Sequence, residues 1–259
     1  MKLDAPTGPL IVPALGAGAE SVWFSLVVPT YNERGNVEAL VKTACALLDQ
    51  NYKGRYEIIF ADDNSPDGTA DRVMELASDF SQVRVMVRTE ERGLATAVIR
   101  GWQKSRGEVL GVIDGDLQHP MDILLPLLKH IEGGADLAFA TRYTQEGGLG
   151  TWGLMRKLNS QVASMMCYVL LPEVTSHVSD PMSGCFVLRR SAIEGVILQA
   201  KGYKILLEIL GRGRAKKIAE AAYVFQMRQH GTTKLTWKQY LEYIQQLCEL
   251  RMHLWTKRT

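Results

Sequence analysis

From residue 22 onward, short apolar runs alternate with segments whose apolar residues recur at helical spacing. In residues 37–48, Val, Leu, Ala and Cys side chains return every three or four positions, which predicts an amphipathic helix. Further helices are expected at 69–80, 93–105 and 122–131, and strands at 22–28, 56–61, 83–87, 109–113 and 136–140. This alternation predicts an α/β fold with a mainly parallel central sheet and helices on both of its faces.

The pattern changes after Arg142. A glycine-rich loop precedes a long predicted helix at 154–171, and further strands are expected at 185–188 and near 221–225. The last predicted element, 236–255, is a strongly amphipathic helix, and one stripe of it is formed by Trp237, Tyr240, Leu241, Ile244, Leu247 and Cys248. Such a stripe is consistent with packing onto the domain. Because aromatic and basic residues are mixed there, it is equally consistent with an interfacial helix at a membrane surface.

Composition limits the environment of the chain. Its 259 residues contain no run of about 18 uncharged apolar residues, so no transmembrane helix is predicted. The four scattered cysteines are expected to be buried free thiols, which favours a reducing, cytoplasmic compartment. The net charge of +2 is unevenly distributed, because residues 201–259 hold 12 Lys and Arg against 4 Asp and Glu. This basic quarter favours an anionic partner (a membrane surface, nucleic acid or phosphates) or is a solubilising surface.

The first candidate site is the pentapeptide 114–118, which follows the apolar run at 109–113. Asp114, Asp116 and Gln118 are spaced so that two carboxylates and an amide oxygen can converge on a divalent cation. The alternative is an ordinary solvated turn, since Asp and Gly are common turn residues. A metal site at the C-terminal end of a parallel strand would indicate chemistry on a phosphorylated substrate, such as a nucleotide.

Two more polar clusters follow predicted strands, at 29–33 and 62–69. Because the carboxyl ends of parallel strands lie along one edge of a sheet, all three clusters are expected to converge there. Asp63 and Glu33 can accept hydrogen bonds from a base or ribose, and Tyr31 can stack on a base. Each cluster alone is consistent with a turn, whereas three acidic clusters at successive strand ends favour a nucleotide site.

The order of these motifs resembles a known family. The sequence has P-T-Y-N-E, then D-D-N-S-P-D-G-T, then R-G-L-A-T-A and D-G-D-L-Q-H-P, as do inverting glycosyltransferases of family 2 with the GT-A fold. Later motifs resemble, within that family, the polyprenyl-phosphate sugar synthases, in particular the dolichol-phosphate mannose synthases. These later motifs are Thr141-Arg142-Tyr143, Gly147-Gly148, Arg156 with Ser160, residues 180–184, and Arg228 with Gly231 and Lys234.

The resemblance implies a role for each matched position. It implies a GT-A catalytic domain at 21–235. Residues 1–20, which are rich in Ala, Gly and Pro, are expected to form a flexible N-terminal tail, and residues 236–259 a basic, aromatic C-terminal helix. Nucleotide-sugar binding would involve Pro29, Tyr31, Glu33, Asp63, Asp114, Gly115, Asp116, Arg228 and Lys234. Mg²⁺ or Mn²⁺ would be held by Asp114, Asp116 and Gln118. Acceptor phosphate would be bound by Arg142, Arg156 and Ser160, and the catalytic set would be Asp116, Arg142, Arg156 and Asp180.

The residue chemistry agrees with these roles. Arg156 and Ser160 are four residues apart and therefore share a helix face, and arginine suits phosphate oxygens. A phosphate monoester is largely ionised at neutral pH, since its second pKa is about 6, and needs no strong base. Asp180 is the one plausible base and is given a lesser role, such as orienting an arginine.

The expected activity is transfer of mannose from GDP-mannose to a polyprenyl (dolichyl-type) phosphate. The enzyme would be peripheral on the cytoplasmic face of a membrane and would have no nucleic-acid partner. Alternatives are another donor such as UDP-glucose, a hydroxyl acceptor with Asp180 as base, or a non-catalytic membrane-associated scaffold. The sequence disfavours a dinucleotide dehydrogenase, because no G-x-G-x-x-G follows the first strand of the α/β region.

Overall fold

The computed structural model describes residues 1–16, 22–143, 154–176, 178–199, 203–224, 226 and 237–256, and only the backbone of 154–161, 237 and 238. Among them, eight strands form one sheet in the order β1-β4-β3-β2-β5-β7-β6-β8. The strands are β1 (Lys2–Leu3), β2 (Phe24–Thr30), β3 (Tyr56–Asp62), β4 (Val83–Val87), β5 (Val109–Val112), β6 (Leu137–Thr141), β7 (Phe186–Arg189) and β8 (Ile218–Ala222).

The sheet is parallel except at β7, which runs antiparallel between β5 and β6. The predicted mainly parallel sheet is therefore confirmed. One strand differs in position, because the strand expected near 221–225 is observed at 218–222. Its pairing with β6 begins at Leu137 and Ile218, so backbone pairing, and not the more apolar stretch downstream, sets its limits.

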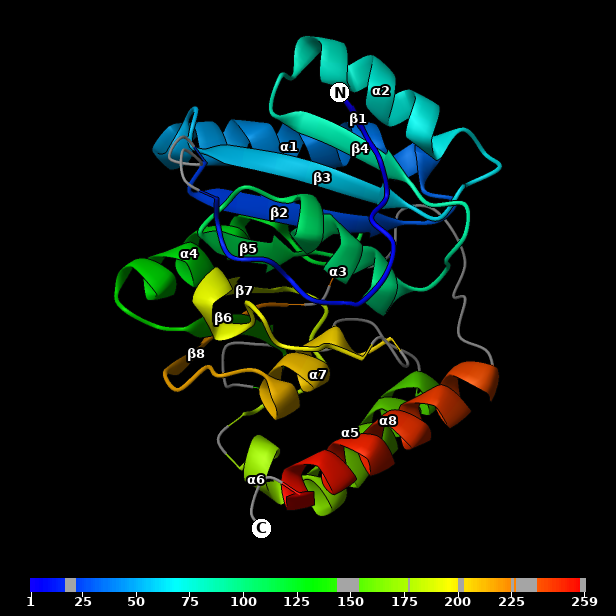
Figure 1. Ribbon diagram of the computed structural model, residues 1–259, viewed down its shortest axis with the longest axis vertical. Helices are drawn as coiled ribbons and strands as arrows, with labels where there is room; N and C mark the ends of the chain where they lie inside the picture. Colours follow the sequence, from blue (N-terminus) through cyan, green and yellow to red (C-terminus); the bar gives the residue numbers. More distant parts are fainter. Residues whose placement is uncertain are drawn as a thin grey trace.

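Helices cover both faces of the sheet, as Figure 1 shows. One face packs against α1 (Arg34–Tyr52), α2 (Thr69–Asp79) and α4 (Leu124–Glu132), and the other against α3 (Leu94–Lys104) and α7 (Ile205–Arg212). Consecutive residues of one strand, such as Leu26 and Val27, enter different cores, because side chains alternate across a sheet. Nearly continuous apolar strands are therefore required, which is why they stand out in the sequence.

A third layer lies outside this sandwich. It consists of α5 (Leu154–Leu170), the short α6 (Pro172–Thr175) and the C-terminal α8 (Trp237–Thr256). The helices α5 and α8 run side by side, and the Tyr243 hydroxyl of α8 donates to the Ala163 carbonyl of α5 at 2.7 Å. The buried face of α8 contains Tyr243, Leu247 and Leu250. Among the described side chains of the predicted α8 stripe, only Leu247 belongs to this face, whereas Tyr240, Leu241, Ile244 and Cys248 are exposed.

Residues 1–16 are not a free tail, in contrast to the flexible segment predicted for 1–20. β1 pairs in parallel with β4, and Val12 is fully buried. The guanidinium of Arg100 donates to the Gly8 carbonyl at 2.9 Å, and that of Arg190 donates to the Pro13 carbonyl at 3.1 Å. The composition of the segment predicted disorder. That prediction was wrong because the side chains that bind its carbonyls come from distant parts of the chain, which local composition does not reveal.

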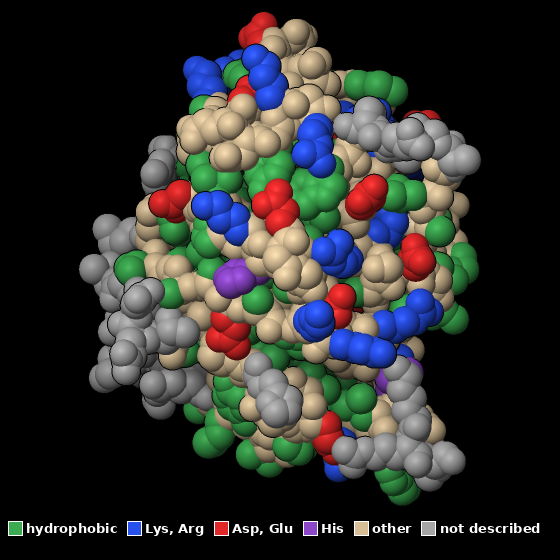
Figure 2. Space-filling model, turned by 90° about the vertical axis from the view of Figure 1, so that its left-hand side faces the viewer, with side chains coloured by type: hydrophobic (Ala, Val, Ile, Leu, Met, Phe, Trp, Pro, Cys, Tyr) green, Lys and Arg blue, Asp and Glu red, His purple; other side chains and the backbone are tan. Residues whose placement is uncertain are grey.

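Glu57 of β3 ties several segments together near the N-terminal ends of the strands. Its buried carboxylate accepts hydrogen bonds from the Ser25 hydroxyl (2.8 Å), the Arg84 guanidinium (2.6 Å) and the Arg106 backbone N–H (2.6 Å). Burial alone would raise the pKa of Glu57, but these donors outweigh it and hold the pKa below its usual value. Figure 2 shows this face of the molecule, on which acidic, basic and apolar side chains are interspersed.

We expect Glu57→Gln to lower the free energy of unfolding by about 2–3 kcal/mol at neutral pH, because the guanidinium groups of Arg84 and Arg106, which both form ion pairs with Glu57, lose their buried carboxylate. A carboxylate with a lowered folded-state pKa stabilises above its unfolded pKa, and this contribution disappears as pH falls through the folded value. The difference between the wild type and Glu57→Gln should therefore shrink in urea unfolding at progressively lower pH. Glu75→Gln, which breaks an exposed pair with Arg72, is the control and should change little. Equal losses in both variants would contradict the role of Glu57.

Candidate active site

The C-terminal ends of β2, β3, β5 and β6 meet at one edge of the sheet, on the right of Figure 1, and the predicted polar loops follow them. The loops after β2 and β3 are joined directly. The backbone N–H of Asn32 donates to the Ser65 hydroxyl at 2.9 Å, and that of Glu33 donates to the Thr69 hydroxyl at 3.0 Å. The two loops therefore form one connected surface beside the end of β5.

Each of the three loops contains a residue with left-handed backbone geometry. They are Asn32, Asn64 and Leu117, with φ of 55°, 54° and 58°, and no other non-glycine residue of the described part has positive φ. Asparagine tolerates this conformation, whereas leucine rarely adopts it. Such strain persists where the surrounding structure imposes it, often at functional sites. At Leu117 it reverses the chain between Asp116 and Gln118.

The three predicted metal ligands lie on this reversed loop after β5. Asp116 is buried, and one of its carboxylate oxygens accepts the backbone N–H of Gln118 at 3.1 Å. The side-chain nitrogen of Gln118 donates to the Gln226 carbonyl at 3.2 Å, which orients the amide. The side chain of Asp114 is 30% exposed. The described residues contain no group of three His, Cys, Asp or Glu that could hold a metal, so a cation here would need the amide as well as the two carboxylates. These oxygen donors fit Mg²⁺ or Mn²⁺.

Close backbone approach explains two glycines at this loop. A Cβ at Gly184 would lie 2.4 Å from a carboxylate oxygen of Asp114, so any side chain there would displace the predicted ligand. At Gly115 a Cβ would lie 3.2 Å from the Thr30 side chain and 3.3 Å from the Pro29 carbonyl, so alanine would require only a small adjustment. Gly115 therefore lies directly against the end of β2.

Pro29 lies near the C-terminal end of β2, and the loop that follows carries Tyr31 and Glu33; all three are predicted to hold the nucleoside. Pro29 and Tyr31 are partly exposed, and the Arg92 guanidinium lies 5.5 Å from the centroid of the Tyr31 ring. Glu33 is buried, and its carboxylate accepts a hydrogen bond from the Asn36 amide at 2.7 Å. An accessible aromatic ring beside a carboxylate suits a base and a ribose, and the nucleoside role of these residues stays a prediction.

Asp63, the fourth predicted nucleoside residue, is bound within the protein. One of its carboxylate oxygens accepts hydrogen bonds from the Arg88 guanidinium, and the other accepts the Gly93 backbone N–H at 2.7 Å. Arg88 is 2% exposed and also donates to the Gly93 carbonyl at 3.1 Å. Asp63 and Arg88 thus hold the start of α3 beside the end of β3. Sequence reasoning missed Arg88, because its only signal was its position just after a strand.

Arg142 and Asp180 form a buried, two-pronged ion pair at the end of β6. Arg142 Nε lies 2.7 Å from one carboxylate oxygen of Asp180, and a terminal guanidinium nitrogen lies 2.9 Å from the other. Asp180 is fully buried and Arg142 is 8% exposed. Burial alone would lower the pKa of Arg142, but the hydrogen bonds and charge of Asp180 outweigh it and raise the pKa. The guanidinium also lies 5.3 Å from the centroid of the Tyr143 ring. Asp180 therefore orients Arg142.

His119 lies between the acidic loop and this ion pair. Its ring stacks on Tyr223 with centroids 5.0 Å apart, and its Nδ1 lies 3.8 Å from a carboxylate oxygen of Asp114. Burial lowers the pKa of His119 to about 4, and its charge interactions are with Asp116, Arg142, Asp180 and Lys204. The imidazole is therefore neutral at physiological pH. It is an uncharged group between the carboxylates of the loop after β5 and the Arg142 guanidinium. Its signal in the sequence was its place directly after the metal motif.

Lys204 is a second residue that sequence reasoning missed. Its ammonium donates to the Met182 carbonyl at 3.2 Å and lies 4.6 Å from the centroid of the Tyr203 ring. Its backbone carbonyl accepts the Gln246 side-chain amide of α8 at 3.1 Å. It thus joins the 180–184 segment to α8. In the sequence it was one lysine among many in a basic quarter.

The remaining predicted phosphate residues are not described as side chains. The backbones of Arg156 and Ser160 belong to the helix α5, as predicted, and so occupy one helix face. Arg228 and Lys234, together with Gly147 and Gly148, lie outside the described residues. Among the described side chains, the basic groups that interact with His119 are those of Arg142 and Lys204.

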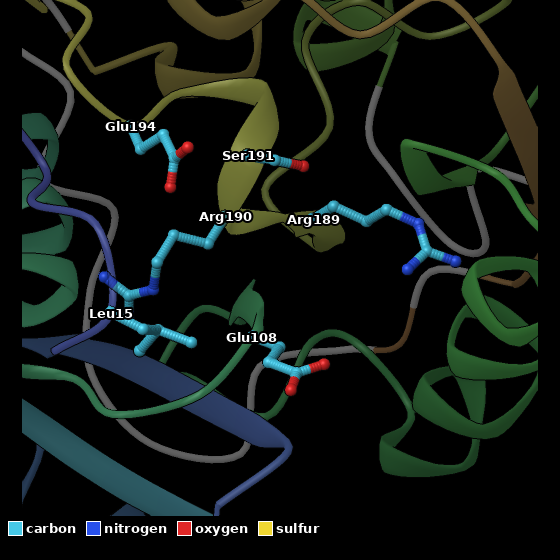
Figure 3. A pocket seen from close by; sticks show the side chains of 6 residues that line it. All are labelled: Leu15, Glu108, Arg189, Arg190, Ser191 and Glu194. Atoms are coloured by element: carbon cyan, nitrogen blue, oxygen red, sulfur yellow. The ribbon is translucent and has the colours of Figure 1, made fainter. Parts of the chain in front are cut away.

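A hollow lies at the opposite ends of the strands. It is lined by Leu15, Glu108, Arg189, Arg190, Ser191 and Glu194. Figure 3 shows Arg189 and Arg190 pointing in opposite directions. Arg190 donates to the Gly107 carbonyl at 2.9 Å, and Arg189 donates to the Ala135 carbonyl at 3.1 Å. Both guanidinium groups therefore hold main chain in place.

Two solved structures show the same fold. One is glucosyl-3-phosphoglycerate synthase from Mycobacterium tuberculosis in complex with Mn²⁺, UDP-glucose and phosphoglyceric acid. It has a TM-score of 0.61 and 22% identity, covering 93% of this chain and 82% of that one. Mannosyl-3-phosphoglycerate synthase from Rubrobacter xylanophilus has a TM-score of 0.61 and 19% identity, covering 91% and 75%. At these identities the likeness concerns the fold, and it confirms the predicted GT-A fold.

Curated relatives are more similar in sequence. Dolichol-phosphate mannosyltransferase of Pyrococcus furiosus is 40% identical over 227 residues, which is 87% of this chain and 63% of that protein. The chain therefore spans less than two thirds of the length of this relative. Dolichol-phosphate mannosyltransferase of Saccharomyces cerevisiae is 35% identical over 239 residues, covering 89% of this chain and 87% of that protein. The model of the family "Glycosyl transferase family 2" matches residues 25–197, more than half of the chain. The chain belongs to glycosyl transferase family 2.

Proposed function

We propose that the protein transfers mannose from GDP-mannose to a polyprenyl (dolichyl-type) phosphate, with inversion at the anomeric carbon. The observation that carries the proposal is the buried Arg142–Asp180 pair beside the acidic loop of Asp114 and Asp116. Such a site presents an oriented cation where the acceptor would arrive, which suits an anionic nucleophile. The curated relatives, named dolichol-phosphate mannosyltransferases, support the choice of sugar and acceptor.

In this proposal the donor occupies the acidic half of the site. Pro29, Tyr31, Glu33 and Asp63 hold the nucleoside, with Gly115 lying against it. Asp114, Asp116 and Gln118 would bind Mg²⁺ or Mn²⁺, and positive charge bound there stabilises the leaving diphosphate. Support for a divalent cation comes from the oxygen donors of this loop and from the Mn²⁺ in a structural neighbour. Arg228 and Lys234 are proposed to contact the donor phosphates.

The acceptor phosphate is proposed to bind to Arg142, Arg156 and Ser160. One of its oxygens attacks the anomeric carbon while the bond from that carbon to the diphosphate oxygen breaks. The phosphate oxygen is already anionic at neutral pH, so no side chain has to remove a proton. The neutral imidazole of His119 separates the two anionic substrates without adding a charge of its own.

The structure disfavours the alternative of a hydroxyl acceptor with Asp180 as base. Both carboxylate oxygens of Asp180 accept hydrogen bonds from Arg142, and Asp180 is fully buried. A general base must reach the proton that it removes. Asp180 is proposed instead as the group that orients Arg142.

Peripheral membrane binding is the second part of the proposal. No helix of the described residues is long and apolar enough to cross a bilayer. Apolar side chains are nevertheless exposed along both outer helices, on α5 at Val162, Met165 and Val169 and on α8 at Leu241, Ile244, Met252 and Trp255. Because α5 carries Arg156 and Ser160, lipid contact along these helices would place a polyprenyl phosphate headgroup near the site. The cytoplasmic face is proposed because free cysteines favour a reducing compartment.

The activity is tested with a matched panel of donors and acceptors. Purified protein is incubated with GDP-mannose or UDP-glucose and with a polyprenyl phosphate or the corresponding polyprenol. We expect transfer from GDP-mannose to the phosphate alone, giving a β-linked product by NMR. Transfer to the polyprenol would overturn the anionic acceptor, and preference for UDP-glucose would overturn the donor. Absence of any transfer would favour a non-catalytic scaffold.

The metal ligands are tested with Asp116→Asn. Loss of one carboxylate should lower kcat/KM by about 100-fold or more and weaken Mn²⁺ binding, because charge stabilisation of a leaving group is a large term. Asp122→Asn is the matched control, since Asp122 is an exposed acid a few residues along the same segment. Mn²⁺ binding is followed by electron paramagnetic resonance with and without GDP. Unchanged Mn²⁺ affinity in Asp116→Asn would show that this residue is not a ligand.

Membrane contact is tested with the double variant Met165→Glu and Met252→Glu, which places a charge on each exposed helix face. Removal of two apolar side chains from a lipid contact should weaken sedimentation with anionic vesicles at least about tenfold. Met74→Glu is the control, because Met74 is an exposed methionine of α2, away from these helices. Transfer to a short, water-soluble polyprenyl phosphate should be unaffected. Equal vesicle binding by all three proteins would contradict the proposal.

A further inference from the structure

The Arg142–Asp180 pair is flanked by a chain of hydrogen bonds that ends on Glu220 of β8. The Ser179 backbone N–H donates to one carboxylate oxygen of Glu220 at 2.9 Å, and the Ser179 hydroxyl bonds to the other oxygen. The Thr141 hydroxyl lies 2.6 Å from the Ser179 hydroxyl and accepts the Tyr143 backbone N–H at 3.3 Å. Since the Ser179 proton is directed to the carboxylate, Thr141 donates to Ser179.

The hydrogen-bonded residues Thr141 and Ser179 are neighbours in sequence of the two members of the ion pair. Thr141 directly precedes Arg142, and Ser179 directly precedes Asp180. Asp180 is therefore adjacent to a residue that Glu220 binds directly, and Arg142 to one that is linked to Glu220 through the Ser179 hydroxyl. Bonds within such a chain polarise one another, so loss of the terminal acceptor weakens all of them.

Glu220 is unusual for its strand. β8 reads I-A-E-A-A, and its charged residue pairs with Phe139 of β6 in the sheet register. Side chains at Phe139 and Thr141 share a face of β6, so Glu220 stands on the same face as Thr141. A partly buried carboxylate is costly unless hydrogen bonds satisfy it, and both of its oxygens are satisfied by Ser179. The other residues of β8 are one isoleucine and three alanines, so Glu220 is the one residue of this strand that can accept side-chain hydrogen bonds.

A third layer of the protein fastens the same loop. The Tyr168 hydroxyl of α5 donates to the Ser179 carbonyl at 2.7 Å, so the backbone of Ser179 is held on both sides. Arginine and aspartate side chains can form an ion pair in several orientations. With the backbones at both ends fixed, the guanidinium is restricted to one direction, and an acceptor phosphate needs that direction to be constant.

We infer that Glu220 is a positioning residue for the acceptor phosphate, acting through Ser179 and Thr141 to hold the Arg142–Asp180 pair. The inference rests on the proposed function for its kinetic consequence, but its structural consequence is independent of the reaction. Glu220 touches no substrate in this scheme. Its loss should therefore affect use of the acceptor phosphate while GDP binding is preserved.

The kinetic test compares Glu220→Ala, Glu220→Gln and a control, Asp136→Ala. Asp136 also fixes main chain next to β8, since its carboxylate accepts the N–H groups of Lys216 and Lys217 at 2.8 and 2.9 Å, but it does so at the far end of the strand. Glu220→Ala should raise the KM for polyprenyl phosphate about tenfold or more and change the GDP affinity less than about twofold. Glu220→Gln retains an acceptor for Ser179 and should recover most of the loss. Asp136→Ala should leave the acceptor KM unchanged.

A structural measurement separates failure of this inference from failure of the proposed function. The Arg142 Nε–H resonance, assigned by its loss in Arg142→Lys, reports the ion pair by NMR even if no sugar is transferred. Its hydrogen exchange should accelerate in Glu220→Ala and in Ser179→Ala but not in Asp136→Ala. If Glu220→Ala does not fold, Ser179→Ala and Glu220→Gln supply the comparison. Unchanged exchange in the folded variants, or equal acceleration in Asp136→Ala, would overturn the positioning role whether or not the enzyme transfers mannose.

Discussion

The candidate site depends on the parallel register of β2 with its two neighbours. β2 pairs with β3 over its full length and with β5 over its first four residues. This pairing alone brings the loops that follow the three strands to one edge of the sheet. The edge also receives the left-handed residues Asn32, Asn64 and Leu117, one in each loop. A shift of one residue in either pairing would turn every side chain of a strand to the other core. The two hydrophobic cores on opposite faces of the sheet therefore fix the strand register, and with it the positions of the loops that form the site.

Charge separation is the second organising feature. The loop after β5 concentrates carboxylates, whereas the end of β6 presents the guanidinium of Arg142, and the neutral ring of His119 lies between them. A buried ion pair gives little net stability, because the cost of removing two charges from water consumes most of their attraction. The Arg142–Asp180 pair at the end of β6 is therefore better explained by its effect on the orientation of the guanidinium than by a gain in folding stability. The hydrogen bonds around Ser179 fit the same explanation, since they add direction to the pair and contribute little to the hydrophobic core.

Much of this arrangement could be predicted from the sequence because parallel strands buried on both faces are nearly continuous apolar runs. The polar loops were readable for the same reason, since each one interrupts such a run. Three features could not be read. β7 inserts antiparallel between β5 and β6, which depends on pairing partners far apart in the chain. Residues 1–16 are held by side chains such as Arg100 and Arg190, which are distant in sequence. Arg88 and Glu220 act through contacts that no local spacing encodes.

The outer helices connect these features to the surface of the molecule. Tyr168 lies on α5 among exposed apolar residues, yet its hydroxyl bonds to the carbonyl of Ser179 beside the ion pair. On α8, the amide of Gln246 bonds to the carbonyl of Lys204, whose ammonium holds the Met182 carbonyl. Any displacement of either helix relative to the sheet must carry these segments with it or break the bonds. The helices that are proposed to meet a lipid thus brace the segments beside the Arg142–Asp180 pair, whereas the loops after β2 and β3 are braced by the sheet and α3. In the proposed function, contact with a lipid surface would therefore act on the half of the site assigned to the acceptor and leave the half assigned to the donor in place.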